Sequence, residues 1–295
     1  MLFLAGSIIL SSYLVLAFKV LQRLGLDVFQ SIVFNYLTCV IVGSVTNGSF
    51  PINAEVVSSG WFLWACGMGA MFIVLFNITG ITTQRINVAV ASVANRLSLI
   101  IPVVFSIYLY NESLLKMQWL GIALILFAVV FTCWPNQQTA KRNTANHFLL
   151  FLLPIVLFIG SGLLDTFIKF VETTYINEVN QDAYLVTAFA SAATIGVIIL
   201  LVQVLRGKQA LSWKNIVAGI LIGIPNYFSI WCQIHFLKVS PWPSSAAIPL
   251  NNLGIILFST LVAAMVFKDK LSLLNRVGIF ISVVAIYLIA FGSSL

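Results

Sequence analysis

Long runs of apolar residues, separated by short polar breaks, extend along the whole chain. They lie roughly at residues 2–22, 28–46, 60–81, 86–110, 115–134, 148–171, 182–205, 213–237, 242–267 and 273–293. Most of these runs have the length of about 20 residues that an apolar helix needs to cross a hydrocarbon core roughly 30 Å thick. The pattern therefore predicts ten transmembrane helices.

The continuity of these runs decides between the two kinds of membrane fold. Backbone N–H and C=O groups must find partners within the protein when lipid surrounds them, which leaves helices or closed barrels. Barrel strands would give short segments in which apolar and polar residues alternate, whereas these runs are long and unbroken. The predicted fold class is an all-α integral membrane protein.

Composition supports a membrane protein. Apolar residues make up 61% of the chain and charged residues only 8%, against about 25% charged residues in an average soluble domain. The net charge of +7 comes from basic residues scattered over short breaks, which is typical of membrane-protein loops rather than of a nucleic-acid surface. The expected partners are therefore membrane lipid and a small-molecule substrate, with no nucleic acid.

The cysteines predict no metal, cofactor or disulfide framework. They lie in or at the ends of apolar runs without CxxC spacing, at Cys39, Cys66, Cys133 and Cys232, and read as small buried apolar residues. The first apolar run has no basic segment before it and no small-residue cleavage site. We therefore expect it to be a membrane helix rather than a cleaved signal peptide.

The two halves of the chain match each other weakly but in order. A shift of 157 residues places the fourth and fifth runs on the ninth and tenth, with Asn95 on Asn252, Glu112 on Asp269, Leu114 on Leu271, Gly121 on Gly278 and Ala128 on Ala285. A shift of 150 similarly places residues 11–19 on residues 161–169. We predict two five-helix repeats, residues 1–134 and 148–295, joined by a polar linker at residues 135–147.

An odd number of helices in each repeat has a geometric consequence. The second repeat must start from the opposite side of the membrane, so the halves would be related by a pseudo-twofold axis in the membrane plane. Inverted repeats of this kind are typical of transporters, whose substrate site lies near the midplane between them.

Several short motifs near the ends of the predicted helices carry a family resemblance. They are Pro102 to Tyr108, Asn111-Glu112-Ser113-Leu114, Gln118-Trp119-Leu120-Gly121, Lys268-Asp269-Lys270-Leu271 and Val277-Gly278, with Lys19 and Lys169 ending the first and sixth helices. With them the chain resembles, over almost its whole length, the ten-helix EamA-type members of the drug/metabolite transporter superfamily. It departs from the family at Asp269, where glutamate is usual, and at Ser259, where proline is common. The resemblance implies a permease that exports amino acids or other metabolites, without indicating which one.

Polar side chains form stripes on four of the predicted helices. An ionisable group within a span costs roughly 2.5–3.5 kcal/mol on insertion scales and usually faces a bundle interior. At about 100° per residue, each of the following sets shares one helix face: Ser92, Asn95, Arg96 and Ser106; Ser161, Asp165, Lys169 and Glu172; Tyr227, Trp231, His235 and Lys238; Ser244, Asn251, Asn252 and Ser259. We predict a polar cavity walled by these helices, with substrate-binding candidates Arg96, Asn95, Asp165, Lys169, Asn251, Asn252, Tyr227 and Trp231.

Simpler interpretations exist for most of these residues. Asp165 and Lys169 are spaced to pair along one helix, and lysines near helix ends can extend to the headgroups. The asparagines can hydrogen-bond between helices, and His235 can be structural. Arg96 lies near mid-depth in its span, too far from either end to reach the headgroups easily, which favours a cavity or ion-pair role.

The predicted function is secondary transport of a small polar or amphipathic metabolite, amino-acid-like and exported, by alternating access across the plasma or inner membrane. The sequence contains no GxxxxGK[ST] motif for a nucleotide-driven pump. Arg96 would bind a carboxylate through its planar fork of donors. Asp165 is the candidate for proton coupling, because a carboxylate in a span can take up and release a proton. A monomer is plausible, but the sequence does not determine the oligomeric state.

Other functions and the sidedness of the chain stay open at this stage. An exchanger of phosphorylated or nucleotide-linked solutes is the alternative, although the predicted cavity has few basic residues. A membrane-embedded enzyme acting on lipid is a less favoured alternative, and an enzyme is not predicted, because His147 and His235 are far apart and form no cluster with acidic residues. The positive-inside rule places both termini outside, since the basic residues concentrate after the odd-numbered helices, whereas family members often have both termini in the cytoplasm.

Overall fold

The computed structural model describes residues 2–102, 104–105, 116–133, 147–177, 180–240, 244–268 and 271–291. Within these ranges the chain is all-helical and contains no β-strand. The predicted all-α class is therefore confirmed. The motifs at residues 106–115 and 269–270, and the linker up to residue 146, lie outside the described residues.

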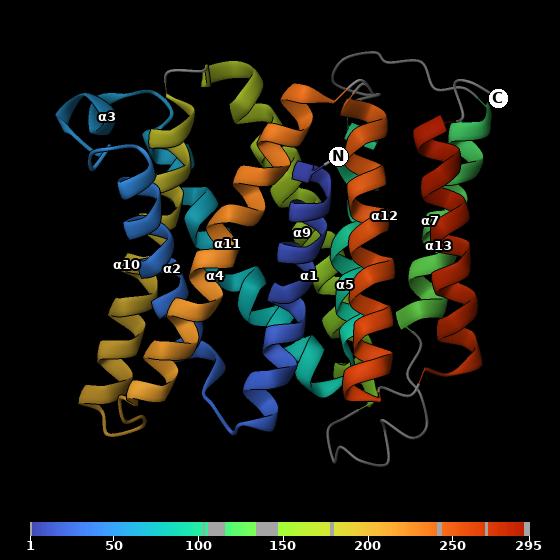
Figure 1. The fold of residues 1–295 in the computed structure, drawn as a ribbon, viewed down its shortest axis with the longest axis horizontal. Coiled ribbons are helices and arrows are strands. Elements are labelled where there is room, and N and C mark those ends of the chain that lie inside the picture. The colour runs from blue at the N-terminus through green and yellow to red at the C-terminus, as the bar shows by residue number, and fades with distance from the viewer. Residues whose placement is uncertain are drawn as a thin grey trace. The chain divides into compact units, whose positions relative to one another are not determined.

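The helices follow the apolar runs closely (Figure 1). Their bounds are α1 Leu2–Arg23, α2 Val28–Thr46, α3 Ala54–Ser58, α4 Phe62–Arg85, α5 Val88–Leu97, α7 Lys116–Cys133, α9 His147–Tyr175, α10 Gln181–Leu205, α11 Trp213–Val239, α12 Ser244–Val262, the π-helical turn η1 Ala263–Phe267, and α13 Leu273–Phe291. The short helix α3 was not predicted; it lies in the polar break between the second and third apolar runs. The fourth run is the other departure, because α5 ends at Leu97 and residues 98–99 form a turn before helical backbone resumes at Ile100.

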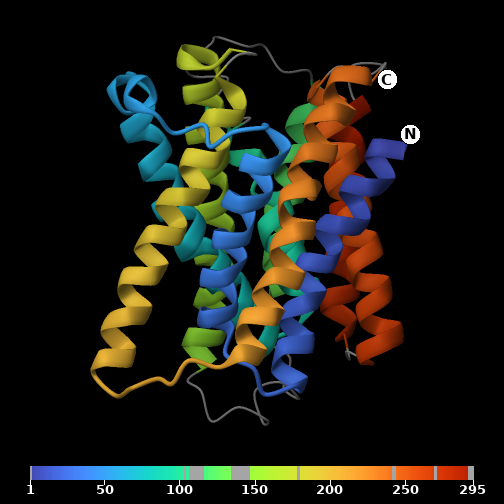
Figure 2. The same cartoon turned by 60° about the vertical axis from the view of Figure 1, so that its left-hand side comes forward.

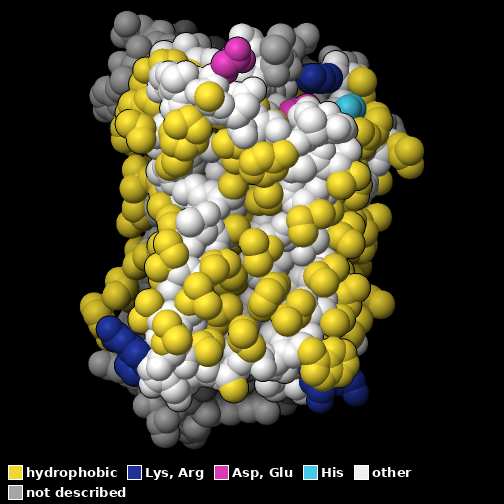
Figure 3. Space-filling view, turned by 90° about the vertical axis from the view of Figure 1, so that its left-hand side faces the viewer, with side chains coloured by type: hydrophobic (Ala, Val, Ile, Leu, Met, Phe, Trp, Pro, Cys, Tyr) yellow, Lys and Arg dark blue, Asp and Glu magenta, His cyan; other side chains and the backbone are white. Residues whose placement is uncertain are grey.

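Seven of these helices are long and apolar enough to cross a membrane, and three shorter apolar helices occupy Val88–Pro102, Trp119–Thr132 and Leu273–Leu288. This is the pattern of a multi-pass membrane protein. Outward-facing side chains agree with it: along the end of α10, Ile198, Leu201 and Leu205 are 56%, 51% and 84% exposed. On the face shown in Figure 3, hydrophobic side chains cover the middle, and the described Lys, Arg, Asp and Glu side chains in view lie at the two ends.

Polar residues in the breaks explain where several helices begin. The side chains of Asp27 and Asn87 accept hydrogen bonds from the backbone amides of Gln30 and Val90, each at 2.7 Å. The first turn of a helix leaves these amides without a backbone partner. The breaks between apolar runs therefore contain the chemistry that starts the next helix, which is why the predicted and observed starts agree.

The chain divides into two compact units, and each draws segments from both predicted repeats. Unit 1 comprises Met1–Lys19, Ile78–Asp165 and Ser229–Leu295, and unit 2 comprises Val20–Asn77 and Thr166–Phe228. Helices α1, α4, α9 and α11 each contribute to both units. The units are described separately below.

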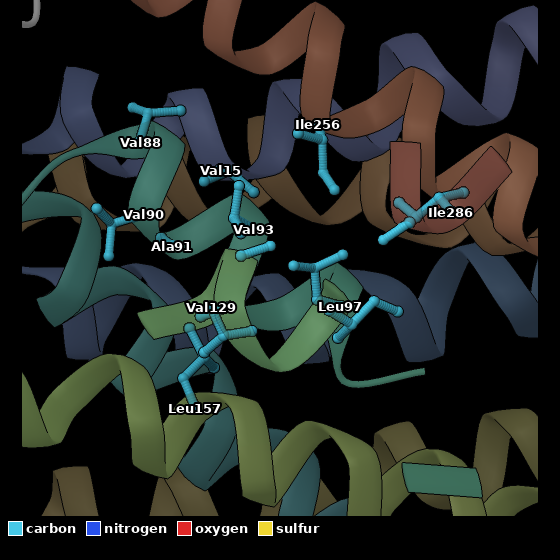
Figure 4. Packing of buried hydrophobic residues seen from close by; sticks show 14 of the residues in the cluster. Val15, Val88, Val90, Ala91, Val93, Leu97, Val129, Leu157, Ile256 and Ile286 are labelled. Atoms are coloured by element: carbon cyan, nitrogen blue, oxygen red, sulfur yellow. The ribbon is translucent and has the colours of Figure 1, made fainter. Parts of the chain in front are cut away.

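Helix α5 forms the centre of unit 1. Its residues Val88, Val90, Val93, Ala94 and Leu97 are all at most 1% exposed. They belong to one apolar cluster with residues of α1, α7, α9, α12 and α13, including Val15, Val129, Leu157, Ile256 and Ile286 (Figure 4). A helix that is apolar and buried on so many sides has few positions for polar side chains. The polar residues of α5, Ser92, Asn95 and Arg96, are therefore candidates for a functional role.

Helices α7 and α13 of unit 1 pack closely and run antiparallel. Asn275, in the first turn of α13, donates a 2.6 Å hydrogen bond to the carbonyl of Thr132, near the end of α7. A Cβ at Gly278 would lie 3.0 Å from the carbonyl oxygen of Ala128 and against Thr132, so this contact requires glycine. Helices α12 and α13 lie side by side (Figures 1 and 2).

Unit 2 is assembled by similarly close approaches between helices. Helix α2 runs antiparallel to α10, because Gly43 near the end of α2 lies against Val186 near the start of α10, while Gly196 further along α10 lies against Val33. Helix α11 approaches α2 through Gly219 and Gly223, whose added Cβ atoms would each lie 2.7 Å from a backbone carbonyl oxygen of α2. The two glycines form a GxxxG motif, a known means of close helix packing in membranes.

Candidate functional site

Helix α5 is interrupted one residue after Arg96, so the continuous helix expected over residues 86–110 is not observed. The α-helix ends at Leu97, Ser98 and Leu99 form a turn, and helical backbone resumes at Ile100. Pro102 has no N–H with which to continue the ladder to the Ser98 carbonyl, which instead accepts a 2.9 Å hydrogen bond from the amide of Ile101. Proline chemistry therefore explains why the helix tightens and breaks at this point.

The interruption places Arg96 near Asp165 of α9, within unit 1. Arg96 and Asp165 interact electrostatically. Ser98, at the break itself, has one hydroxyl proton to share between two acceptors, the backbone carbonyl of Asn95 and Oδ2 of Asp165, which lies 3.4 Å from Ser98 Oγ. Three of the predicted site residues, Asn95, Arg96 and Asp165, are thus gathered around one turn of α5.

Asp165 lies on the side of α9 that faces the break after α5, where its Oδ2 is 3.4 Å from Ser98 Oγ. Gly162, one turn earlier on α9, lies directly against Ile101, so this face of α9 packs on α5, and α5 is the most enclosed helix of the unit. The side chain of Asp165 is nevertheless exposed, whereas Arg96 and Asn95 are partly buried. The surrounding protein also desolvates the Asp165 carboxylate. Asp165 is thus accessible and also close to the neighbouring helix α5.

Helix α12 carries the two predicted asparagines toward different neighbours. Ser259 donates a 2.9 Å hydrogen bond to Ser92 of α5, and Asn252, two turns earlier, shares the helix face of Ser259. Asn251 lies one turn before Gly254, which meets Ile8 of α1. Asn251 is 0% exposed, and neither polar atom of its amide has a hydrogen-bond partner among the described residues. Within the described part of the chain, Asn251 therefore forms no hydrogen bond between helices, and its role stays a prediction.

The two aromatic candidates on α11 fall into different units. Trp231 belongs to unit 1, where its ring stacks on that of His235 with centroids 3.8 Å apart and meets Phe3 edge-on. The Nδ1 atom of His235 lies 2.9 Å from the Trp231 carbonyl oxygen, which is consistent with a structural histidine. Tyr227 belongs to unit 2, where it is buried against Gly43.

Lys169 is one turn beyond Asp165 on α9 and falls in unit 2. It is partly buried and makes interactions of its own. The electrostatic partner that the structure assigns to Asp165 is Arg96, on another helix. Pairing of Asp165 with Lys169 along α9 stays a prediction.

Some polar residues that organise the structure were not singled out from the sequence. Ser98 is one, although Pro102, four residues later, marks a place where a helix can kink. Unit 2 contains another set, in which the buried Gln30 side chain accepts a 2.8 Å hydrogen bond from Asn215 Nδ2 and donates one of 2.8 Å to the Ala210 carbonyl. No pattern within one helix indicates that pairing, because the partners come from α2, from the segment before α11 and from the first turn of α11.

Metal-ligand chemistry does not arise among the described residues, where no group of three or more His, Cys, Asp and Glu side chains comes together. The chemistry of the site is instead that of one guanidinium, one carboxylate, hydroxyls and amides. These groups recognise charge and hydrogen-bonding capacity in a ligand.

Comparison with known proteins supports the fold and leaves function open. No protein-family model matches the chain. An uncharacterised protein of Haemophilus influenzae is 24% identical over 281 residues, covering 91% of this chain and 90% of that protein. A protein of known crystal structure superposes with a TM-score of 0.63 at 16% identity, covering 98% of this chain and 96% of that one. The chain therefore shares its fold with a protein of solved structure.

Proposed function

We propose that this protein is a secondary transporter of the ten-helix EamA type, built from two inverted five-helix repeats. It moves a small polar metabolite, amino-acid-like and bearing an anionic group, by alternating access, with Arg96 and Asp165 in the transport path. The observation that carries the proposal is the charged pair at the interrupted turn of α5, the most enclosed helix of unit 1.

The described helices support ten spans. Seven are long enough to cross a membrane as they stand. The three shorter ones coincide with the fourth, fifth and tenth apolar runs. Each of these runs also includes residues outside the described ranges. Ten spans also agree with Figure 1, where the first residues of α1 and the last residues of α13, both in unit 1, lie at the same end.

The packing of the helices supports inversion of the repeats. Under the predicted repeat, α2 corresponds to α10, α5 to α12 and α7 to α13. Each helix packs against its own counterpart, and the contacts described above show that the pairs α2–α10 and α7–α13 are antiparallel. Antiparallel pairing of counterparts is what a twofold axis in the membrane plane produces.

Small residues at the α7–α13 contact repeat in the same way. Ala128 of the first repeat lies against Gly278 of the second. The proposed twofold axis would pair their counterparts, Ala285 and Gly121, and both of these residues are buried. Burial of both counterparts is what this alignment of the two halves predicts.

The energetics of charge support a functional role for Arg96 and Asp165. Keeping an ionisable group within a span costs a few kcal/mol, and such groups usually mark a substrate or ion pathway. Interrupted membrane helices likewise form binding sites in secondary transporters, because the break frees backbone groups at mid-depth. Here Arg96, one member of the charged pair, lies two residues before the break that begins at Ser98.

Reconstitution into liposomes tests this function. We expect purified protein to give saturable uptake, or counterflow, of at least one member of a panel of radiolabelled L-amino acids and dicarboxylates. Protein-free liposomes provide the background. If the folded protein moves no member of the panel above that background in either assay, an amino-acid-like transporter is ruled out.

A further inference from the structure

We propose that an anionic substrate group and Asp165 bind Arg96 in turn, and that Asp165 takes up one proton whenever the substrate displaces it. This inference rests on the proposed transport function and deepens it. It makes the substrate an anion, most simply a carboxylate, and couples each substrate molecule to one proton.

The charge balance at the α5 break leads to this coupling. Among the described residues, the groups that act on Asp165 are Arg96, of opposite charge, and the neutral hydroxyl of Ser98. Lys169, one turn along α9, makes interactions of its own and is not one of these groups. Together Arg96 and Asp165 carry no net charge. An added carboxylate would leave one uncompensated negative charge, and an unpaired charge in the protein interior costs several kcal/mol. A proton on Asp165 removes that charge, so anion and proton binding favour each other.

The geometry shows which partner can be displaced. Arg96 is partly buried and lies on the enclosed helix α5, in its last turn before the break. Asp165 is exposed, and its hydrogen bond from Ser98, at 3.4 Å, is longer than the usual 2.5–3.0 Å for an O–H donor. The arginine is therefore the fixed member of the pair and the carboxylate the exchangeable one. A guanidinium also matches the two oxygens of a ligand carboxylate.

The proton balance of one cycle follows directly. The substrate arrives as the anion and displaces the Asp165 carboxylate from Arg96. The Asp165 carboxylate then binds one proton from water on that side. On the other side the substrate leaves, Asp165 releases the proton to water there, and the Asp165 carboxylate pairs again with Arg96. No covalent bond other than this O–H bond forms or breaks, and a monoanion crosses without net charge movement.

Binding of acetate, as the smallest carboxylate probe, tests the displacement without knowledge of the natural substrate. Thermal unfolding of the purified full-length protein is measured in sodium acetate and in sodium chloride at equal ionic strength, at mildly acidic and mildly alkaline pH. For wild type we expect acetate to raise the melting temperature more at the acidic pH. In Asp165→Asn, which resembles the protonated state, the rise should be about 3 °C at tenfold the dissociation constant, at both pH values. Arg96→Gln should show no acetate effect, and Asp182→Asn, at an exposed position of unit 2, should behave like wild type.

Two outcomes overturn the proposal. One is an acetate effect in Arg96→Gln equal to that in Asp165→Asn; the other is a wild-type acetate effect that is absent or does not change with pH. The wild-type measurement decides the matter even if a variant does not fold. Liposome flux separates this inference from the proposed function. If acetate binding depends on pH but no substrate flux occurs, transport is rejected and the displacement is kept. If substrate flux occurs without pH-dependent acetate binding, the displacement is rejected and transport is kept.

Discussion

Replacing Arg96 with glutamine is expected to lower the initial rate of substrate uptake about a hundredfold, equivalent to about 2.7 kcal/mol. Glutamine keeps much of the length and polarity of the side chain but removes the charge that attracts the anion and balances Asp165. Truncating one partner of a desolvated charge pair commonly costs about 2–5 kcal/mol, which brackets this loss. The measurement is uptake into liposomes, normalised to the amount of folded protein.

Two further variants give this experiment its controls. Arg96→Lys keeps the charge but not the planar fork of donors, so we expect intermediate uptake. Arg206→Gln removes an arginine from an exposed position after α10 and should leave uptake unchanged. Uptake by Arg96→Gln at the wild-type rate would remove Arg96 from the transport path.

Replacing Gly69 with alanine is expected to destabilise unit 2 by about 3 kcal/mol, the upper part of the range for overpacking a tight interface. A Cβ at Gly69 would collide with the Ala188 carbonyl oxygen and lie 2.7 Å from Ser191 Cβ and 2.8 Å from the Ala192 backbone nitrogen. Two of these three atoms belong to the backbone of α10, so the two helices would have to separate. We expect a clear fall in the melting temperature of the detergent-purified protein and a low yield of monodisperse material.

Gly67, two residues earlier on α4, provides a matched control. A Cβ there would lie 3.6 Å from the tip of the Phe167 ring, an ordinary van der Waals distance. Because alanine also favours a helix by up to about 1 kcal/mol over glycine, Gly67→Ala should be neutral or slightly stabilising. Equal melting temperatures for the two alanine variants would show that α4 and α10 do not approach as closely as described.

The helices could be predicted from the sequence because lipid imposes a simple rule on it. A span must be long and apolar, and the breaks must contain groups such as Asp27 and Asn87 that start the next helix. Hydropathy could not locate the interruption after α5, because it does not change at Pro102, whose missing N–H breaks the hydrogen-bond ladder of the helix. The short helix α3 could not be located either, because it lies within a polar break.

The composition of the candidate site could be predicted only in part. Helical periodicity places Arg96, Asp165 and the asparagines on stripes, but it says nothing about which stripes face one another. Local spacing suggested Lys169 as the partner of Asp165, whereas the structure assigns Arg96. Similarly, Tyr227 and Trp231 share a helix face but belong to different compact units. Such pairings depend on close contacts between helices, as at Gly162 and Gly219. The residues in these contacts are far apart in the sequence, so the pattern within one helix does not predict them.

The sidedness of two equivalent loops tests the inverted arrangement most directly. After replacement of the four native cysteines by alanine, single cysteines are introduced at Leu24, which follows α1, and at Thr174, in the last turn of α9; both positions are exposed. Intact cells are then treated with a membrane-impermeant maleimide, with labelling of permeabilised cells as the reference. Inverted halves predict that one of the two cysteines reacts in intact cells and the other only after permeabilisation. Labelling of both from the same side would mean that the two halves cross the membrane in the same orientation, and the proposed architecture would be wrong.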